Sequence, residues 1–262
     1  MLLHTVSFIA SAFLLWFGSE WIVDSAAAVA RRFKVSELVI GLTIVAMGTS
    51  APEFLVTVTA AFRDMADISL SNVVGSNIFN LGFILGFMAL IKPLPTTRTL
   101  VFRDGLLLLG VTVLILGLAM TGVLGRITGV ALLCFLGGYV GWLLAFGSRN
   151  TVFVEQPEVR TARWWDFPRL LAGFGAIALG GHLMVDSASF FAVSFGVSRW
   201  VVGVTVVAAG TSLPEVVTCL AATLKGRNEM LLGNLVGSDF FNFAGVLGLT
   251  CILRPLDVAP GA

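Results

Sequence analysis

The chain has 262 residues, of which 57% are hydrophobic and only 12% are charged, and its formal net charge is +1. A soluble domain carries about 45–50% apolar and about 25% charged residues, so a soluble enzyme and a disordered chain are both excluded. The balanced charge also excludes a nucleic-acid-binding protein, which presents a basic patch. The composition therefore indicates an integral membrane protein that lies in a lipid bilayer.

Apolar stretches long enough to cross about 30 Å of hydrocarbon occur eight times along the chain. The first stretch has no basic segment before it and continues past Glu20, so it is predicted to be a retained span and not a cleaved signal peptide. The eight predicted helices cover residues 5–30, 38–62, 68–91, 104–121, 126–147, 168–193, 200–224 and 230–253.

Lys and Arg are distributed unequally between the two sides of these spans. One side carries twelve of them, and the other carries four, which are Arg63, Arg126, Arg199 and Arg254. Because basic loops stay in the cytoplasm, the N-terminus is predicted to lie outside and the connection 149–167 inside. The expected location is the plasma membrane, or the inner membrane of a bacterium.

The sequence contains an internal repeat. A shift of 162 residues aligns residues 18–86 with 180–248 without a gap, and 29 of the 69 pairs are identical. Two unrelated apolar stretches share Leu and Val by chance, but not Pro, Glu, Gly and Ser at equal spacing. The repeated blocks are Gly48-Thr49-Ser50 and Gly210-Thr211-Ser212, Pro52-Glu53 and Pro214-Glu215, and Gly75-Ser76 and Gly237-Ser238.

The two copies of the repeat must cross the membrane in opposite directions, because five spans separate each residue from its counterpart. Inverted-topology repeats are typical of secondary transporters, whose substrate site lies near the midplane where the repeats meet. We therefore predict an all-α integral membrane protein of the inverted-repeat transporter class. The first five-span repeat covers 1–148, a short cytoplasmic connection covers 149–167, and the second repeat covers 168–262. The second repeat is expected to lack its last two spans, which leaves eight spans of an expected ten.

Two glutamates fall in the middle of predicted spans. Glu53 lies about 15 residues into its span and Glu215 holds the same place in its own, and neither span contains a basic residue. A charge at this depth is costly and is retained where it has a partner or a function. The alternative is a protonated glutamate that is hydrogen-bonded inside the helix bundle.

Other oxygen donors surround the glutamates in the sequence. Each Glu follows a proline that cannot donate a backbone hydrogen bond, so the helix is predicted to unwind and to free carbonyls around Ala46–Gly48 and its counterpart. The next span of each repeat adds a Ser and an Asn at i, i+4. An all-oxygen set of this kind suits Ca²⁺, which takes 6–8 oxygen ligands. No paired Cys or His indicates a softer metal, and no cofactor is expected.

Both blocks of motifs resemble a known family. Gly48-Thr49-Ser50-Ala51-Pro52-Glu53 with Gly75–Asn80, and Gly210-Thr211-Ser212-Leu213-Pro214-Glu215 with Gly237–Asn242, look like the two α-repeats of sodium/calcium exchangers, in the calcium:cation antiporter superfamily. The resemblance covers roughly 18–90 and 180–250. It implies exchange of Ca²⁺ for Na⁺ by alternating access, with the first and sixth helices sliding across a more rigid core. It implies as ion ligands the carbonyls of Ala46 and Ala208 and the side chains of Thr49, Ser50, Glu53, Ser76, Asn80, Thr211, Ser212, Glu215, Ser238 and Asn242.

One position departs from the family pattern. The sodium-coupled branch often has Asp where this chain has Asn242, and the acid lies instead at Asp239, opposite Asn77 of the first repeat. Asp239 is therefore a further candidate ligand that supplies the missing charge, or else a helix-packing substitute for an amide. Asn at positions 80 and 242 resembles the neutral residues that proton-coupled relatives have there. The Gly-Thr-Ser-x-Pro-Glu signature, in contrast, favours the sodium branch.

The expected function is that of a secondary active antiporter exchanging Ca²⁺ for a monovalent cation, Na⁺ being favoured. An enzyme is not expected, because His4 and His182 are the only histidines and no Gly-x-Ser-x-Gly motif occurs. A Ca²⁺/H⁺ antiporter, a cation-channel-like protein and a truncated fragment without transport remain as alternatives. The sequence predicts no oligomeric state.

Overall fold

The computed structural model describes residues 1–146, 162–198, 202 and 208–257. Within these residues, six continuous helical segments are long and apolar enough to cross a membrane: Leu2–Phe33, Ala66–Ile91, Leu100–Ala119, Arg126–Phe146, Asp166–Ser194 and Asn228–Leu253. A further span is bent by 48° between Glu37–Thr49 and Ala51–Phe62. The predicted span 200–224 is described only from residue 208 onward and at Val202. The expected helical membrane protein is confirmed.

The first half of the chain contains most of the labelled elements. They are α1 (Leu2–Phe33), α2 (Glu37–Ile40), η1 (Gly41–Val45), α3 (Ala46–Thr49), α4 (Ala51–Phe62), α5 (Ala66–Ile78), η2 (Phe79–Ile84), α6 (Leu85–Ile91), η3 (Leu100–Gly105), α7 (Leu106–Ala119), β1 (Val123–Leu124) and α8 (Arg126–Phe146). Those labelled η are π-helical segments that continue the neighbouring α-helices.

The second half repeats part of this series. It contains α9 (Asp166–Ser194), α11 (Ala208–Gly210), α12 (Leu213–Leu224), α13 (Asn228–Phe240), the π-helical η6 (Phe241–Val246), α14 (Leu247–Leu253) and β2 (Leu256–Asp257). β2 pairs with β1 in antiparallel register, with Leu124 opposite Leu256, and so joins the α7–α8 turn to the segment after α14.

The helix boundaries follow the sequence repeat. α4, α5, η2 and α6 begin and end at residues that reappear, after the shift of 162, as the ends of α12, α13, η6 and α14. Even the π-helical segments match, since Phe79–Ile84 corresponds to Phe241–Val246. The repeat found in the sequence is therefore a repeat of structure.

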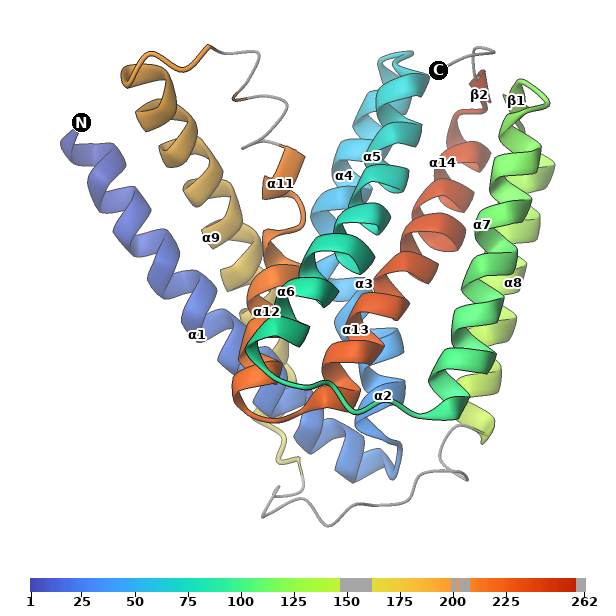
Figure 1. Cartoon of the computed structure of the whole chain (residues 1–262), viewed down its shortest axis with the longest axis horizontal. Helices are drawn as coiled ribbons and strands as arrows, with labels where there is room; N and C mark the ends of the chain where they lie inside the picture. Colours follow the sequence, from blue (N-terminus) through green and yellow to red (C-terminus); the bar gives the residue numbers. More distant parts are fainter. Residues whose placement is uncertain (147–161, 199–201, 203–207, 258–262) are drawn as a thin grey trace.

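The helices form two flanks and a centre (Figure 1). α1 and α9 lie side by side on one flank, α7 and α8 lie on the opposite flank, and α13 and α14 run between them. In the apolar 18-residue stretch of Asn228–Leu253, 78% of the residues are buried, whereas 22% are buried in the corresponding stretch of α8. The α13–α14 span is therefore the centre of the bundle, and α8 presents most of its surface outward.

Glycines allow the bent span to approach α13 closely. A Cβ on Gly237 would lie 2.6 Å from Leu42 Cα, and one on Gly233 would lie 2.5 Å from the Leu38 carbonyl oxygen. Gly75, the counterpart of Gly237 in the first repeat, makes no such approach to the described residues, because a Cβ there would meet nothing within 4 Å.

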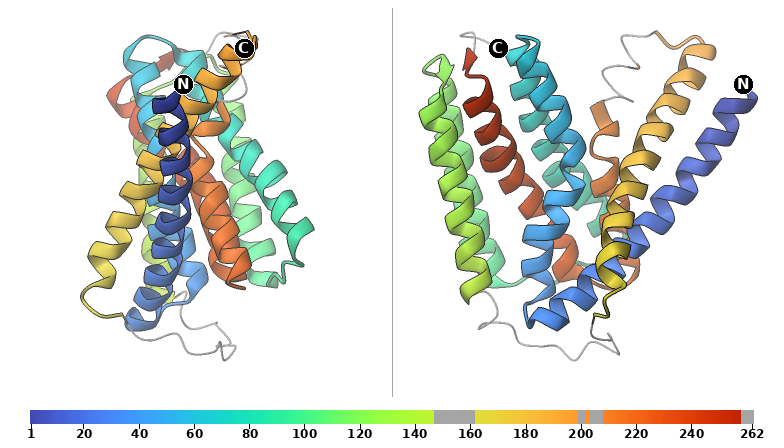
Figure 2. Two further views of the ribbon diagram at one scale, coloured as in Figure 1. Left: turned by 90° about the vertical axis from the view of Figure 1, so that its left-hand side faces the viewer. Right: turned by 180° about the vertical axis from the view of Figure 1, so that it is seen from behind.

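The α1–α9 pair is held together by small residues and joined to the centre by an ion pair. A Cβ on Gly173 of α9 would lie 3.0 Å from the Gly18 carbonyl oxygen of α1. Lys225, which follows α12, places Nζ 2.6 Å from Asp24 Oδ1 of α1. Figure 2 shows that α1 and α9 diverge from the centre toward the end at which α1 begins.

Candidate ion-binding site

The two buried glutamates lie in the first turns of the helices that follow the two interruptions of helical structure. Ser50 and Ser212 each have non-helical backbone angles, with φ −79°, ψ 9° and φ −89°, ψ 7°. Each break is followed by a proline in the first turn of the next helix, where its missing N–H is not needed. Glu53 and Glu215 then lie in the first turns of α4 and α12, each 1% exposed.

Each glutamate accepts a hydrogen bond from the opposite repeat. Ser50 Oγ donates to Glu215 Oε1 over 3.1 Å, and Ser212 Oγ donates to Glu53 Oε1 over 2.9 Å. The two bonds are related by the repeat, since in each a serine of one repeat donates to the glutamate of the other. The two segments at which the helices are interrupted are therefore in contact, and both carboxylates lie at the junction of the repeats.

The second span of each repeat supplies a matching pair of amide contacts. Asn80 Nδ2 donates to Asp239 Oδ1, and Asn242 Nδ2 donates to Asn77 Oδ1, each over 3.0 Å. Asn242 Nδ2 also lies 3.2 Å from Ser76 Oγ. All five side chains are buried. η2 and η6 begin at the residues before Asn80 and Asn242, so a wide helical turn positions both amides.

Thr49 joins the bent span to α13. Its hydroxyl lies 3.2 Å from Asn234 Oδ1 and 3.4 Å from Ser238 Oγ, and it also donates to the Ala46 carbonyl over 3.3 Å. The Ser50 N–H bonds to the same carbonyl over 3.0 Å. The expectation that unwinding frees the Ala46 carbonyl is therefore wrong for this conformation, because the break begins only at Ser50.

The counterparts in the second repeat are described in less detail. Thr211 lies in the turn between α11 and α12, and Ala208 begins α11. The segment before Ala208, residues 203–207, lies outside the described residues. Both candidates therefore occupy the chain positions that correspond to Thr49 and Ala46.

Several buried oxygen atoms of this cluster have no hydrogen-bond partner in the described part of the chain. They come in repeat-related pairs, with Asp239 in addition: Glu53 Oε2 and Glu215 Oε2, Asn80 Oδ1 and Asn242 Oδ1, and Asp239 Oδ2. A buried acceptor without a partner is expensive, and a recurrent set of them needs an explanation. A cation bound between the two glutamates would satisfy their free oxygens, and oxygen ligands are the ones that Ca²⁺ takes.

The donor set is poor in charged ligands. Among the described residues, no three or more His, Cys, Asp or Glu side chains lie close enough together to hold a metal ion. The cluster instead combines carboxylates with hydroxyls and amides. This chemistry fits a cation that enters and leaves, because its ligands are mostly neutral.

A second layer of residues surrounds the cluster and was not predicted from the sequence. Asn72 Nδ2 donates to the Glu53 carbonyl over 3.3 Å and to Thr57 Oγ1 over 2.9 Å. Its counterpart Asn234 donates to Cys219 Sγ over 3.5 Å while accepting from Thr49. Asn72 and Asn234 are identical in the two repeats, so the alignment of the repeats carried the signal that would have found them.

Comparison with known proteins decides the family. The family model described as "Sodium/calcium exchanger protein" matches residues 3–145 and 166–261. The chain belongs to the sodium/calcium exchanger family. This is a family of membrane antiporters, so the chain is a cation transporter.

Several proteins of known name are similar to this chain over almost its whole length. Sodium/calcium exchanger MaX1 of Methanosarcina acetivorans is 34% identical over 282 residues, which cover 92% of this chain and 81% of that protein. Inner membrane protein YrbG of Escherichia coli is 32% identical over 272 residues, 99% of this chain and 83% of that protein. A structure of the sodium-calcium exchanger NCX_Mj without Na⁺ and Ca²⁺ aligns with a TM-score of 0.85 and 33% identity, covering 99% of this chain and 86% of that chain.

Proposed function

We propose that this exchanger-family chain moves Ca²⁺ across a membrane in exchange for Na⁺ by alternating access. The observation that carries the proposal is the pair of buried glutamates. Each is hydrogen-bonded through one oxygen to the other repeat, and the second oxygen of each has no partner among the residues that the structure describes. Two carboxylates at one point in the membrane neutralise one divalent cation. A relative of this family is named a sodium/calcium exchanger, and NCX_Mj has been studied with Na⁺, Ca²⁺ and Sr²⁺.

The proposed ligands come equally from both repeats. The carboxylates bind the cation directly, hydroxyls and amide oxygens complete its shell, and the backbone carbonyls contribute when the breaks open further. The ligand set is Ala46, Thr49, Ser50, Glu53, Ser76, Asn80, Ala208, Thr211, Ser212, Glu215, Ser238, Asp239 and Asn242.

Competition at a single site accounts for exchange. Charged carboxylates are costly to keep buried without a cation, so the empty carrier reorients slowly and the loaded carrier reorients readily. The inverted repeats, which we assign to 1–148 and 168–262, then open the site to either side in turn.

The distribution of basic residues favours one orientation of the chain in the membrane. Basic residues concentrate on the side that contains the α1–α2, α6–α7 and α12–α13 connections, which favours the cytoplasm for that side. We place the N-terminus outside, in a plasma membrane or bacterial inner membrane.

The test is Ca²⁺ uptake into proteoliposomes that contain the purified chain. With Na⁺ loaded inside, uptake should start when external Na⁺ is removed, and Glu53→Gln or Glu215→Gln should abolish it because each removes a charged ligand. Asp67→Asn is the matched control, since it also removes a carboxylate but at an exposed position in the first turn of α5. Uptake by either glutamine variant at the wild-type rate would contradict the proposed site.

The coupling ion is tested in the same vesicles. Asn at positions 80 and 242 is the observation that favours the Ca²⁺/H⁺ alternative. An imposed pH gradient without Na⁺ should drive no uptake by a sodium-coupled carrier. Uptake driven by the pH gradient and indifferent to Na⁺ would replace Na⁺ by H⁺, and voltage-driven flux without any counter-ion would indicate a channel.

A further inference from the structure

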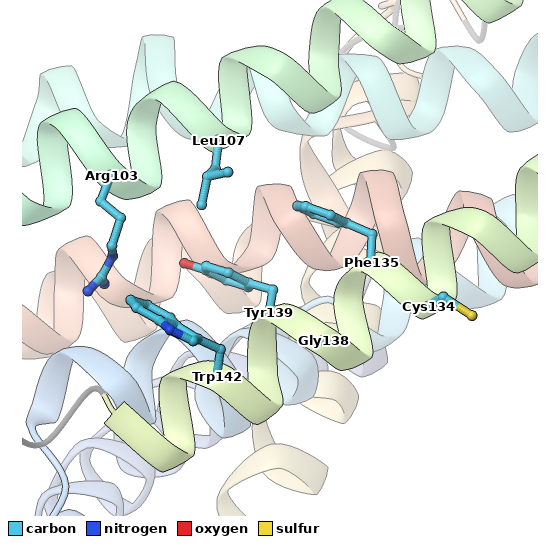
Figure 3. Close-up of a pocket in the computed structure, with 7 residues that line it drawn as sticks. All are labelled: Arg103, Leu107, Cys134, Phe135, Gly138, Tyr139 and Trp142. Carbon is cyan, nitrogen blue, oxygen red and sulfur yellow. The ribbon is translucent and has the colours of Figure 1, made fainter.

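A groove lies on the outer flank of the molecule, between the start of the α7 span and α8. Its volume is about 410 Å³, and its walls come from Arg103 and Leu107 on one helix and from Phe135, Gly138, Tyr139 and Trp142 on the other. Figure 3 shows these side chains facing one another across the gap between the two helices. The groove is separate from the ion-binding cluster.

One end of the groove is polar. The Arg103 guanidinium forms a two-point contact with Asp104, with Nε 2.8 Å from Oδ1 and Nη2 2.7 Å from Oδ2, and its carbon lies 4.9 Å from the Trp142 ring centroid. Asp104 is buried and also accepts from the Tyr139 hydroxyl over 2.9 Å. A guanidinium has five N–H donors, and Asp104 takes two of them. Three donors of a rigidly held arginine therefore remain at the mouth of the groove.

The polar end lies close to the ends of the two helices that line the groove. Arg103 is the fourth residue of the span Leu100–Ala119, and Trp142 lies four residues before the end of α8 at Phe146. At about 1.5 Å per residue, both lie about 5–6 Å from the ends of their helices. Arg and Trp at this depth are typical of contacts with the phosphate and glycerol region of a bilayer.

The rest of the groove is apolar and faces outward. From Trp142 to Cys134 it extends over eight residues of α8, about 12 Å along the helix axis. Other side chains of the two helices are also exposed and apolar, among them Leu106, Leu109 and Leu144. In a membrane-spanning helix pair such a surface contacts acyl chains.

We infer that this groove binds one phospholipid of the surrounding membrane, with its phosphate on Arg103 and one acyl chain along Leu107, Phe135 and Gly138. The hydrogen-bond donors of Arg103 favour this occupant over a second copy of the chain, because an apolar helix face would leave those donors unpaired. The Arg103–Asp104 pair is neutral overall, so binding depends on hydrogen bonds to the phosphate together with burial of the acyl chain.

The bound lipid would support the centre of the molecule. The Tyr139 and Phe135 rings lie 4.5 Å and 6.2 Å from the ring of Phe240 on α13. Phe240 directly follows Asp239. An acyl chain in the groove packs against the outer faces of the same two rings and so holds the helix that carries half of the candidate site.

Gly138 allows a direct test by filling the groove. A Cβ on Gly138 would meet nothing within 4 Å, and the same holds for Gly137, which does not line the groove. We therefore compare Gly138→Phe with its matched control Gly137→Phe, in detergent, by native mass spectrometry with added phosphatidylglycerol. Wild type and Gly137→Phe should retain one lipid per chain, and Gly138→Phe should lose it while melting at a similar temperature.

Several results would overturn the inference. They are a wild-type chain that retains no lipid, a Gly138→Phe variant that retains as much as Gly137→Phe, displacement of the lipid by excess inorganic phosphate, and a dimer that only Gly138→Phe dissociates. The last two would assign the groove to a free anion or to a second copy. If Gly138→Phe fails to fold, Leu107→Trp fills the groove from the other wall and is read in the same way.

A second experiment tests the proposed contact between Arg103 and the phosphate of the lipid. The double variant Arg103→Gln/Asp104→Asn removes both charges together, so that no unpaired charge remains buried. Wild type should retain phosphatidylglycerol in preference to diacylglycerol, and the double variant should show no preference. A wild-type chain that retains both lipids equally would remove Arg103 from the site.

Discussion

Asp239 is the position at which the two halves of the inner cluster differ. Its counterpart is Asn77, and both side chains accept a hydrogen bond from an asparagine of the other repeat over 3.0 Å. Because Asn77 makes this contact without a charge, the contact does not require an acid at Asp239. The second oxygen of Asp239 is buried without a partner among the described residues. We therefore propose that this acid serves a bound cation and not helix packing, and substitution of Asp239 tests the proposal.

Asp239→Asn should therefore weaken Ca²⁺ binding while leaving the fold intact. Loss of one charge a few ångströms from a bound cation should reduce affinity about tenfold or more, since ~1.4 kcal/mol corresponds to a factor of ten. Isothermal titration of the purified chain with Ca²⁺ measures the change. The double variant Asn77→Asp/Asp239→Asn moves the acid to the opposite repeat and should recover affinity. An unchanged affinity in Asp239→Asn would assign that residue to packing.

At the scale of elements, the bent span and α13 approach each other through a glycine seam. Gly237 and Gly233 of α13 lie against Leu42 and Leu38, so the backbones of the two helices are almost in contact. This approach brings Thr49 within reach of Asn234 and Ser238. The seam therefore sets the distance between the ligands of the two repeats.

The seam predicts an asymmetric response to one substitution made at repeat-related glycines. Gly237→Ala places a Cβ 2.6 Å from Leu42 Cα, which must shift the backbone and should cost about 1–3 kcal/mol of stability. Gly75→Ala, the matched control, meets nothing within 4 Å and should be tolerated. Thermal unfolding in detergent compares the two variants. Equal melting temperatures would show that the seam is not tight.

At the scale of the whole molecule, the basic side is one end of the bundle. The end of α1, the α6–α7 connection, the start of α9 and the α12–α13 turn lie together at the lower end of Figure 1. Ion pairs concentrate there, including Lys225 with Asp24 and Arg227 with Glu37. The basic loops from which the orientation is predicted lie far apart in the sequence, but they form one surface of the molecule.

This surface should face the cytoplasm. Thr96→Cys lies in the α6–α7 connection at the basic end, and Thr121→Cys, its matched control, lies after α7 at the opposite end; both positions are exposed. A membrane-impermeant maleimide should label Thr121→Cys in intact cells and Thr96→Cys only after permeabilisation. The reverse pattern of labelling would invert the orientation.

The sequence predicted those features that depend on local pattern or on the repeat. Spans followed from apolar length, and the inverted architecture followed from counting spans. The prolines predicted an interruption of each helix, but around residues 46–48 and not at Ser50, where it occurs. The state of the Ala46 carbonyl was not predictable, because it depends on where the helix stops within a single turn. The contacts of Asp104 with Tyr139 were equally hidden, since 35 residues separate them and the second repeat offers no described counterpart.

The crossed bonds between Ser50 and Glu215, and between Ser212 and Glu53, have a consequence for assembly. Each carboxylate is oriented by a hydroxyl that its own half does not supply, so a single half folds without a finished site. A half alone could complete the cluster only by pairing with a copy inserted upside down, which would require both orientations to occur in one membrane. Joining the halves in one chain, with an odd number of spans between matching residues, fixes both orientations during insertion and makes the meeting of the halves intramolecular.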